Sequence, residues 1–331
     1  MPDRSTQPRD HTVSRRALLT ALCSAPLLGG AVRAARPEAP TDAGFSFVHI
    51  TDPHIQPELG AVEGVRKAFA AIAALSPRPT FALIGGDIVM DAAYVGRNRA
   101  EEVYDLWQTA ADGLGIPLHY SAGNHDIFAV GGSERLPENA PDFGKALWMR
   151  RLGLSQRYAT FEHGAWKFIV LDSVQVGRWA DSPNAQGWRG ELDAEQMVWL
   201  DDLLRKTDPA QPLVFLTHVP ILTLFAQYTK GTTTALGDDK IVRNGKDFVE
   251  RISTHNVRAV LQGHTHVYED CQYRGVRYIT GGAVCGDWWK GPRLGVHPEG
   301  FGVATVYGNT LDYRYHAYGW RSLAPDKSAK I

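Results

Sequence analysis

This sequence has few cysteines, little net charge and few long apolar segments, and each shortage excludes a class of protein. Three cysteines occur in 331 residues, and none lies in the polar motifs described below, which excludes a structural zinc site of the cysteine type. The formal net charge is −1, so no basic field is present that would attract nucleic acid. Hydrophobic residues account for 44% and charged residues for 21%, and we expect an ordinary globular domain with a sizeable core.

The first 34 residues have the pattern of a cleavable export signal. A polar leader precedes Arg15-Arg16, and a short apolar run follows that ends near Val32. Pro26 and two glycines interrupt this run, which is too short to span a bilayer comfortably. The paired arginines resemble a twin-arginine signal, which implies the twin-arginine export machinery as a partner and a periplasmic or secreted location in a bacterium. The alternatives are a disordered tail and a single membrane anchor, but the small residues near positions 32–34, which a signal peptidase needs, favour the signal.

Removal of this signal would change both the charge and the cysteine content of the chain. The signal holds five arginines and two aspartates, so the formal net charge would fall from −1 to −4. Cys23 would be lost, which leaves Cys271 and Cys285 as a pair in an oxidising compartment. A disulfide and two free thiols both remain open, because the sequence does not fix their geometry. We expect three further segments, a linker, one domain and a tail, over residues 35–44, 45–320 and 321–331.

Strand-like apolar runs alternate with helical patterns along the chain. The predicted strands cover residues 45–50, 80–84, 116–122, 158–161, 166–172, 212–217, 257–261, 274–280, 301–306 and 311–316. The predicted helices cover residues 62–75, 99–111, 192–204 and 247–255, and Asp193 caps the third of them. Residues 129–144 are predicted to form a surface loop over the site, and residues 179–191 a second irregular excursion. This alternation predicts an α/β fold with a largely parallel sheet and ligands at the carboxyl ends of its strands.

Five of the strand-like runs end in a loop that carries Asp, Asn or His. These loops are Asp52-Pro53-His54, Gly86-Asp87, Gly123-Asn124-His125-Asp126, His218 and Gly263-His264-Thr265-His266. Any one of them alone would be explained by an Asx-type turn with solvated side chains. Their shared position after apolar runs indicates instead that they gather at one site.

The side chains of these loops suit metal ions. Carboxylate, amide oxygen and imidazole together form a ligand set for divalent or trivalent first-row metals, and iron, manganese and zinc remain open. The seven candidate ligands, too many for one ion, are Asp52, His54, Asp87, Asn124, His218, His264 and His266. We therefore expect two ions that share a bridging carboxylate, an arrangement that clamps a phosphoryl group and generates hydroxide near neutral pH. His125 is left free for acid–base chemistry.

The order Asp-x-His, Gly-Asp, Gly-Asn-His-Asp, His and Gly-His-x-His resembles that of the calcineurin-like metallophosphoesterases over residues 45–270. The resemblance implies a two-sheet β-sandwich flanked by helices, in four layers of order α/β/β/α. It implies that one metal is held by Asp52, His54, Asp87 and His266. It implies that the second is held by Asp87, Asn124, His218 and His264, with Asp87 as the bridge. His125 would protonate the leaving oxygen, and Asp126 would orient His125.

The expected function is therefore hydrolysis of phosphomonoesters or phosphodiesters by a metal-bound hydroxide, on a small-molecule or lipid-linked substrate. A cyclic-nucleotide phosphodiesterase and a nucleotide-sugar-lipid hydrolase of the same family are alternatives, and a metal-binding protein without catalysis is an alternative from another class. Met90 stands where purple acid phosphatases carry a metal-binding tyrosine, which excludes that branch. Val219 replaces a second histidine often found in the cyclic-nucleotide branch, which leaves that assignment open.

A pair of tryptophans, Trp288 and Trp289, follows a glycine-rich stretch near the end of the domain. Two neighbouring indoles could stack on the base or sugar of a substrate. Paired tryptophans also cap the edge of a core, and the sequence leaves both interpretations open.

Overall fold

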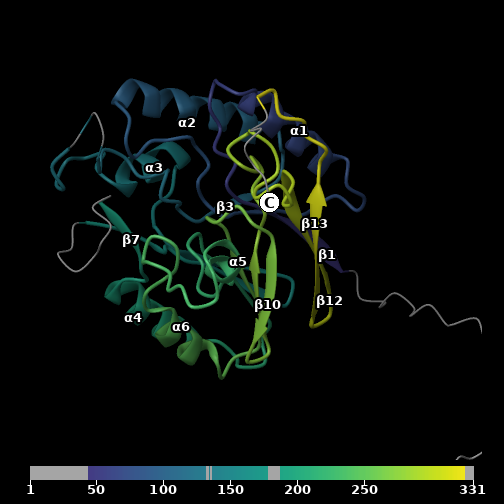
Figure 1. The fold of residues 1–331 in the computed structure, drawn as a ribbon. Helices are drawn as coiled ribbons and strands as arrows, with labels where there is room; N and C mark the ends of the chain where they lie inside the picture. The colour runs from purple at the N-terminus through teal and green to yellow at the C-terminus, as the bar shows by residue number, and fades with distance from the viewer. Residues whose placement is uncertain (1–43, 132–133, 135, 178–186, 325–331) are drawn as a thin grey trace, which may run out of the picture. The chain divides into compact units, whose positions relative to one another are not determined.

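The first of two large sheets has five strands, in the order β13-β12-β1-β2-β3 (Figure 1). In this computed structural model the described residues are 44–131, 134, 136–177 and 187–324. The strands are β1 (Phe45–Ile50), β2 (Ala82–Ile84), β3 (Leu118–Tyr120), β12 (Gly300–Tyr307) and β13 (Thr310–Ala317). Strands β1, β2 and β3 are parallel, whereas β12 is antiparallel to both of its neighbours. The carboxyl ends of β1, β2 and β3 therefore meet at one edge of this sheet.

The second sheet has six strands, in the order β10-β11-β9-β8-β5-β4. They are β4 (Ala159–His163), β5 (Trp166–Val170), β8 (Leu213–Leu216), β9 (Val257–Gln262), β10 (Glu269–Tyr273) and β11 (Val276–Thr280). The four central strands are parallel, and an antiparallel hairpin partner closes each edge. A separate ribbon pairs β6 (Val174–Val176) with β7 (Trp188–Gly190).

Alternation of side chains along the strands divides the core into three apolar layers. Phe47 of β1 packs between the two sheets with Phe168 and Val214 of the second sheet. The next residue, Val48, faces the opposite way and packs against one set of helices. These are α1 (Ala61–Ala73), α2 (Arg97–Asp112) and α3 (Lys145–Leu152). The outer face of the second sheet packs against α4 (Ala194–Arg205) and α6 (Gly245–Ile252). The predicted α/β/β/α order of layers is confirmed.

The predicted strands and helices are present, with ends that differ by a few residues. The predicted cap of α4 is also correct, because the Asp193 side chain accepts a hydrogen bond from the Gln196 backbone N–H. The sequence did not predict α3, β6, β7, β10 or the short helix α5 (Phe225–Thr229). Residues 129–144 were predicted to be a surface loop, yet Ala129 and Val130 are buried in the core.

The predicted export signal, and all but one residue of the predicted linker, lie outside the described residues, as do residues 325–331 of the tail. None of the described helices is long and apolar enough to cross a membrane.

A buried histidine on β1 gives the fold a predictable response to acid. His49 is fully buried, its Nδ1 lies 3.0 Å from the Tyr313 hydroxyl, and burial lowers its pKa to about 4. In the unfolded chain the histidine pKa is about 6.5, so between these two values only the unfolded state takes up the proton. The neutral His49 therefore stabilises the fold above pH 6.5, and this contribution is lost as the pH falls toward 4.

We expect His49→Asn, which keeps a polar atom near Tyr313, to remove this pH response. Between pH 7.5 and pH 5 the free energy of unfolding of wild type should fall by about 2 kcal/mol relative to that of the variant. Denaturant unfolding of both proteins with excess chelator measures the difference. If the difference in unfolding free energy between the two proteins is the same at both pH values, His49 is not the source of the pH response.

Candidate active site

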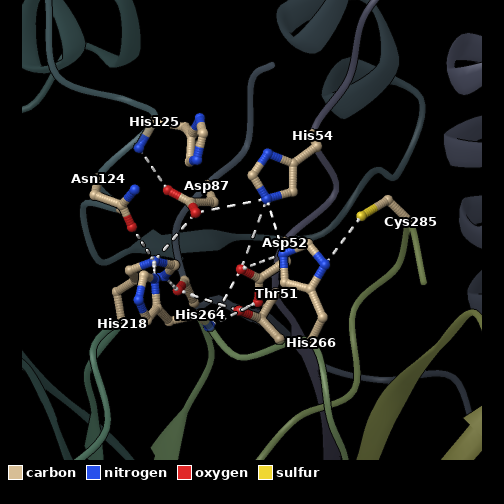
Figure 2. Close-up of polar contacts among 12 residues, drawn as sticks. Thr51, Asp52, His54, Asp87, Asn124, His125, His218, His264, His266 and Cys285 are labelled. Atoms are coloured by element: carbon tan, nitrogen blue, oxygen red, sulfur yellow. Dashed lines mark hydrogen bonds and ion pairs between the residues drawn. The ribbon is translucent and has the colours of Figure 1, made fainter. Parts of the chain in front are cut away.

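The site lies where the carboxyl ends of parallel strands from the two sheets meet. Asp52 and His54 follow β1, Asp87 follows β2, and Asn124 follows β3, all in the first sheet. From the second sheet, His218 follows β8, and His264 and His266 follow β9. Figure 2 shows these side chains converging from both sheets, with Asp87 between the imidazoles of His54 and His218. The structure thus brings all seven predicted ligands together.

Much of the backbone at the site is strained. Five of the seven predicted ligands have a positive φ: Asp52 (52°), His54 (42°), Asp87 (51°), His264 (74°) and His266 (59°). A residue other than glycine in this region costs of order 1–3 kcal/mol, and such residues cluster at functional sites. Gly123 is required by close packing, since a Cβ atom there would lie 2.1 Å from the Asp87 backbone nitrogen. The fold therefore holds these loops in positions that their own preferences would not give.

One group of donor atoms surrounds the imidazole of His54. Its Nε2 lies 3.1 Å from Nε2 of His266 and 3.5 Å from Oδ2 of Asp87. The Oδ1 atom of Asp52 lies 3.4 Å from Nε2 of His266. All four residues are buried, and burial keeps the pKa of His54 well below its usual value. A neutral imidazole is the form that binds metal.

A second group surrounds Nε2 of His218. This atom lies 3.2 Å from Oδ1 of Asn124, 3.2 Å from Nδ1 of His264 and 3.3 Å from Oδ2 of Asp87. Burial alone would lower the pKa of His218, but Asp87, Asp52 and the hydrogen bond to the Gly85 carbonyl together outweigh burial and raise that pKa to about 9. The negative charge that favours a proton on the His218 ring is the charge that a metal cation would neutralise.

Both groups fit a metal ion. Ligand atoms about 2.1 Å from one ion lie about 3.0–3.4 Å from one another, close to the separations found here. Oδ2 of Asp87 belongs to both groups, so this oxygen is placed to bridge two ions. The ligand sets correspond to the two sets that the sequence resemblance implied.

Three of the four imidazoles in these groups are held by a hydrogen bond from the ring nitrogen that points away from the group. His218 Nδ1 donates to the Gly85 carbonyl at 2.7 Å, and His266 Nδ1 donates to the Gly286 carbonyl at 2.8 Å. His264 Nε2 donates to the Asp239 carbonyl at 2.7 Å. Each bond fixes the tautomer and leaves the opposite nitrogen with a lone pair for metal.

His125 lies beside the group around His54, and one of its ring nitrogens is within 4.8 Å of ligand atoms of His54 and Asp87. Its ring centroid is 4.9 Å from that of His54, and its backbone N–H donates to Oδ1 of Asp87 at 2.7 Å. Its Nδ1 lies 3.5 Å from Oδ1 of Asp91. Burial alone would lower the pKa of His125, but Asp87 and then Asp91 outweigh burial and raise it. His125 is thereby placed and charged as a proton donor would be.

Asp126 is occupied with the backbone. Its Oδ2 accepts the N–H groups of Gly123 at 2.8 Å and Asp87 at 2.9 Å, and its Oδ1 accepts that of Ile88 at 2.8 Å. These bonds join the loops that follow β2 and β3. The orienting role predicted for Asp126 stays a prediction, and the carboxylate that forms the ion-pair contact with the His125 ring is that of Asp91.

The two tryptophans have different surroundings. Trp288 lines the pocket at the site, with its ring 4.3 Å from that of His54 between centroids. Trp289 is fully buried, and its Nε1 donates to the His54 carbonyl at 3.0 Å. Of the two interpretations that the sequence left open, the burial of Trp289 favours packing in the core. Trp289 belongs to the core beneath the site because its indole packs against α1, where a Cβ on Gly64 would lie 2.0 Å from it.

The two cysteines in the described part of the chain, Cys271 and Cys285, are free thiols. Cys285 is buried and its Sγ lies 3.7 Å from Nδ1 of His266, on the side of the ring away from the other ligands (Figure 2). Cys271 is on β10. The structure therefore favours two unpaired thiols over the disulfide.

A comparison with known families agrees with this geometry. The model of the calcineurin-like phosphoesterase family matches residues 45–268. The chain belongs to this family. As a calcineurin-like phosphoesterase it is a hydrolase of phosphate ester bonds, which confirms the enzyme class predicted from the sequence.

Relatives of this calcineurin-like phosphoesterase include two kinds of enzyme. The serine/threonine-protein phosphatase CPPED1 of Bos taurus is 28% identical over 255 residues, covering 76% of this chain and 72% of the relative. A probable cyclic nucleotide phosphodiesterase of Psychrobacter arcticus is 23% identical over 261 residues, covering 74% and 81%. A dimetal phosphatase from Danio rerio shares the fold, with a TM-score of 0.61 at 17% identity over 85% of this chain and 99% of that one.

Several residues of the pocket escaped the sequence analysis. The pocket has a volume of about 140 Å³, and its lining includes Trp188, Phe225, Lys240 and Arg293 besides the motif residues. Asp91 lies four residues after Asp87, in no motif of its own. Lys240 and Arg293 belong to loops without a periodic pattern, so only the folded chain shows that they meet at the site.

Proposed function

We propose that this calcineurin-like phosphoesterase is a dinuclear-metal enzyme that hydrolyses phosphomonoesters or phosphodiesters, with iron, manganese or zinc as the metals. The observation that carries the proposal is the pair of donor groups that share Oδ2 of Asp87, with His125 beside them. When bound, the metals would stabilise charge on the phosphoryl oxygens and supply hydroxide near neutral pH.

The protein's own residues divide the remaining tasks. Asp87 joins the two ligand groups, and its Oδ1 holds the His125 backbone, so proton donor and ligands keep a fixed spacing. His125 gives its proton to the leaving oxygen, and Asp91 favours the protonated ring. Metal ions would offset part of the effect of Asp87 on His125, which leaves Asp91 as the supporting carboxylate. Asp126 keeps both loops in register through its backbone hydrogen bonds.

Turnover of aryl phosphates tests the proposal. We expect the protein to hydrolyse an aryl phosphate monoester or diester after loading with Mn²⁺, and to lose that activity on chelation, because hydroxide would then be unavailable near neutral pH. Re-addition of metal should restore turnover, which controls for unfolding. A protein that binds two metals yet hydrolyses no ester in a panel of mono- and diesters would support the alternative of a metal-binding protein without catalysis.

A cyclic-nucleotide phosphodiesterase is the second candidate, and the relative from Psychrobacter arcticus is named as a probable enzyme of that kind. Val219, which is buried beside the ligand His218, replaces the histidine often found in that branch. Inclusion of cyclic nucleotides in the same ester panel separates this activity from action on simple esters. A nucleotide-sugar lipid in that panel covers the third substrate class.

We also propose export by the twin-arginine machinery to the periplasm or the medium. The support is the pattern of the first 34 residues, where Arg15-Arg16 precedes a short apolar run. Replacement of both arginines by lysine keeps the charge, and it should leave the precursor in the cytoplasm. Fractionation followed by immunoblotting measures this, and unchanged export of the Lys-Lys variant would contradict the proposal.

A further inference from the structure

We propose that Lys240 and Arg293 form an anion subsite in the pocket, which selects phosphate esters whose leaving group carries a second negative charge on a planar ring. The inference rests on the proposed phosphoesterase function and specifies its substrate class. Besides the ligands and His125, the charged side chains that line the pocket in the described part of the chain are these two cations.

Lys240 follows Asp239, a residue that contacts the predicted ligand His264. The carbonyl of its neighbour Asp239 accepts the hydrogen bond from Nε2 of His264. The Lys240 ammonium lies 3.5 Å from Oδ2 of Asp239, and that is its one ion pair in the described part of the chain. Lys240 therefore lies close to the second ligand group, and its ammonium keeps donors for a substrate.

Arg293 lies near the first ligand group, the one around His54. Its Nη1 donates to Oδ1 of Asp287 at 2.7 Å, and Asp287 precedes Trp288, whose ring lies against His54. The Nε–H of Arg293 has no partner among the described residues. Asp239 lies between Lys240 and the ligand group of His264, and Asp287 and Trp288 lie between Arg293 and His54. The two cations are therefore placed to meet a group attached to the phosphoryl group rather than the phosphoryl group itself.

Aromatic side chains define what lies between the phosphoryl group and the second charge. Trp188, Phe225 and Trp288 line the same pocket as the two cations. Trp188 is held with its ring 5.7 Å from that of His264, and Trp288 with its ring 4.6 Å from that of His266. Aromatic walls on both sides of the ligands favour a flat, apolar connection. A ring that carries a carboxylate or a second phosphate meets both requirements.

A pair of matched esters tests the subsite. The probes are 4-carboxyphenyl phosphate and 4-carbamoylphenyl phosphate, which have nearly the same shape but differ by one charge. We expect wild type to have a higher kcat/KM for the carboxylate ester than for the amide ester. In the double variant Lys240→Met/Arg293→Met this ratio should fall roughly tenfold, since charged hydrogen bonds are strong. Comparison of the ratio between variants cancels the difference in leaving-group reactivity. Added salt should lower the wild-type preference as well.

Lys246→Met is the matched control, because Lys246 is 86% exposed on α6 and does not line the pocket. It should leave the ratio unchanged, and metal content should be the same in all variants. An unchanged ratio in the double variant with intact metals overturns the subsite.

Binding of non-hydrolysable analogues separates this inference from the proposed function. Calorimetry with 4-carboxybenzylphosphonate and 4-carbamoylbenzylphosphonate needs no turnover. Tighter binding of the carboxylate by wild type alone supports the subsite, even if no ester is hydrolysed and the proposed function fails. Equal binding of the two phosphonates by wild type overturns the subsite, whether or not esters are hydrolysed.

Discussion

The variant Asp87→Asn is expected to lose tight binding at both metal positions and to lose activity by about 10³-fold or more. Oδ2 of Asp87 is the one oxygen that belongs to both donor groups, so the loss of its charge weakens both. Metal ions contribute several kcal/mol to phosphoryl transfer, and each 1.36 kcal/mol is a factor of ten in rate. Asparagine can still accept the His125 N–H at the Oδ1 position, so the loop should keep its shape. Elemental analysis and kcat/KM measure the two effects.

Two further variants show whether the loss is specific to the bridge. His54→Ala removes a ligand from one group alone, and it should release one metal and keep most of the other. Asp172→Asn changes a carboxylate that is equally buried, at the end of β5, where it pairs with Lys145 and Arg157 away from the pocket. It should reduce stability and keep both metals. Two tightly held metals in Asp87→Asn would rule out the bridging assignment.

The metal ligands could be predicted from the sequence because of a simple geometric rule. Each ligand follows an apolar run, and parallel strands present their carboxyl ends at one edge. Asp52, Asp87 and Asn124 follow three neighbouring strands of one sheet, so their proximity follows from strand order. The family resemblance, rather than periodicity, implied that His218 and His264 face these residues from a second sheet.

The surroundings of the ligands could not be predicted in the same way. Trp288 and Trp289 are adjacent in sequence, yet one lines the pocket and the other is buried, because the backbone at both has a positive φ that periodicity does not reveal. Strand β10 was missed because its sequence, EDCQY, lacks an apolar alternation. It is a strand because its backbone pairs with β11 along its whole length.

Replacement of His125 by alanine is expected to reduce kcat/KM for alkyl phosphate esters by roughly 10²–10⁴-fold, with a clearly smaller loss for activated aryl esters. An alkyl ester expels an alkoxide, which needs a proton as the bond breaks. A nitrophenyl ester expels a stable phenolate, which needs little help. The bond between His125 and Asp87 uses the backbone N–H, which alanine keeps, so metal content should not change.

The ratio of the two losses identifies the role of His125. If His125 only supported the turn that holds Asn124, the variant would lose metal, and both ester types would suffer equally. Equal losses with intact metals would instead assign His125 to positioning of the phosphate, and would contradict the role of proton donor. Asp91→Asn gives an independent check, because it leaves the imidazole in place and removes the carboxylate 3.5 Å from its Nδ1. A proton donor that depends on Asp91 predicts the same selective loss on alkyl esters, smaller than that of His125→Ala.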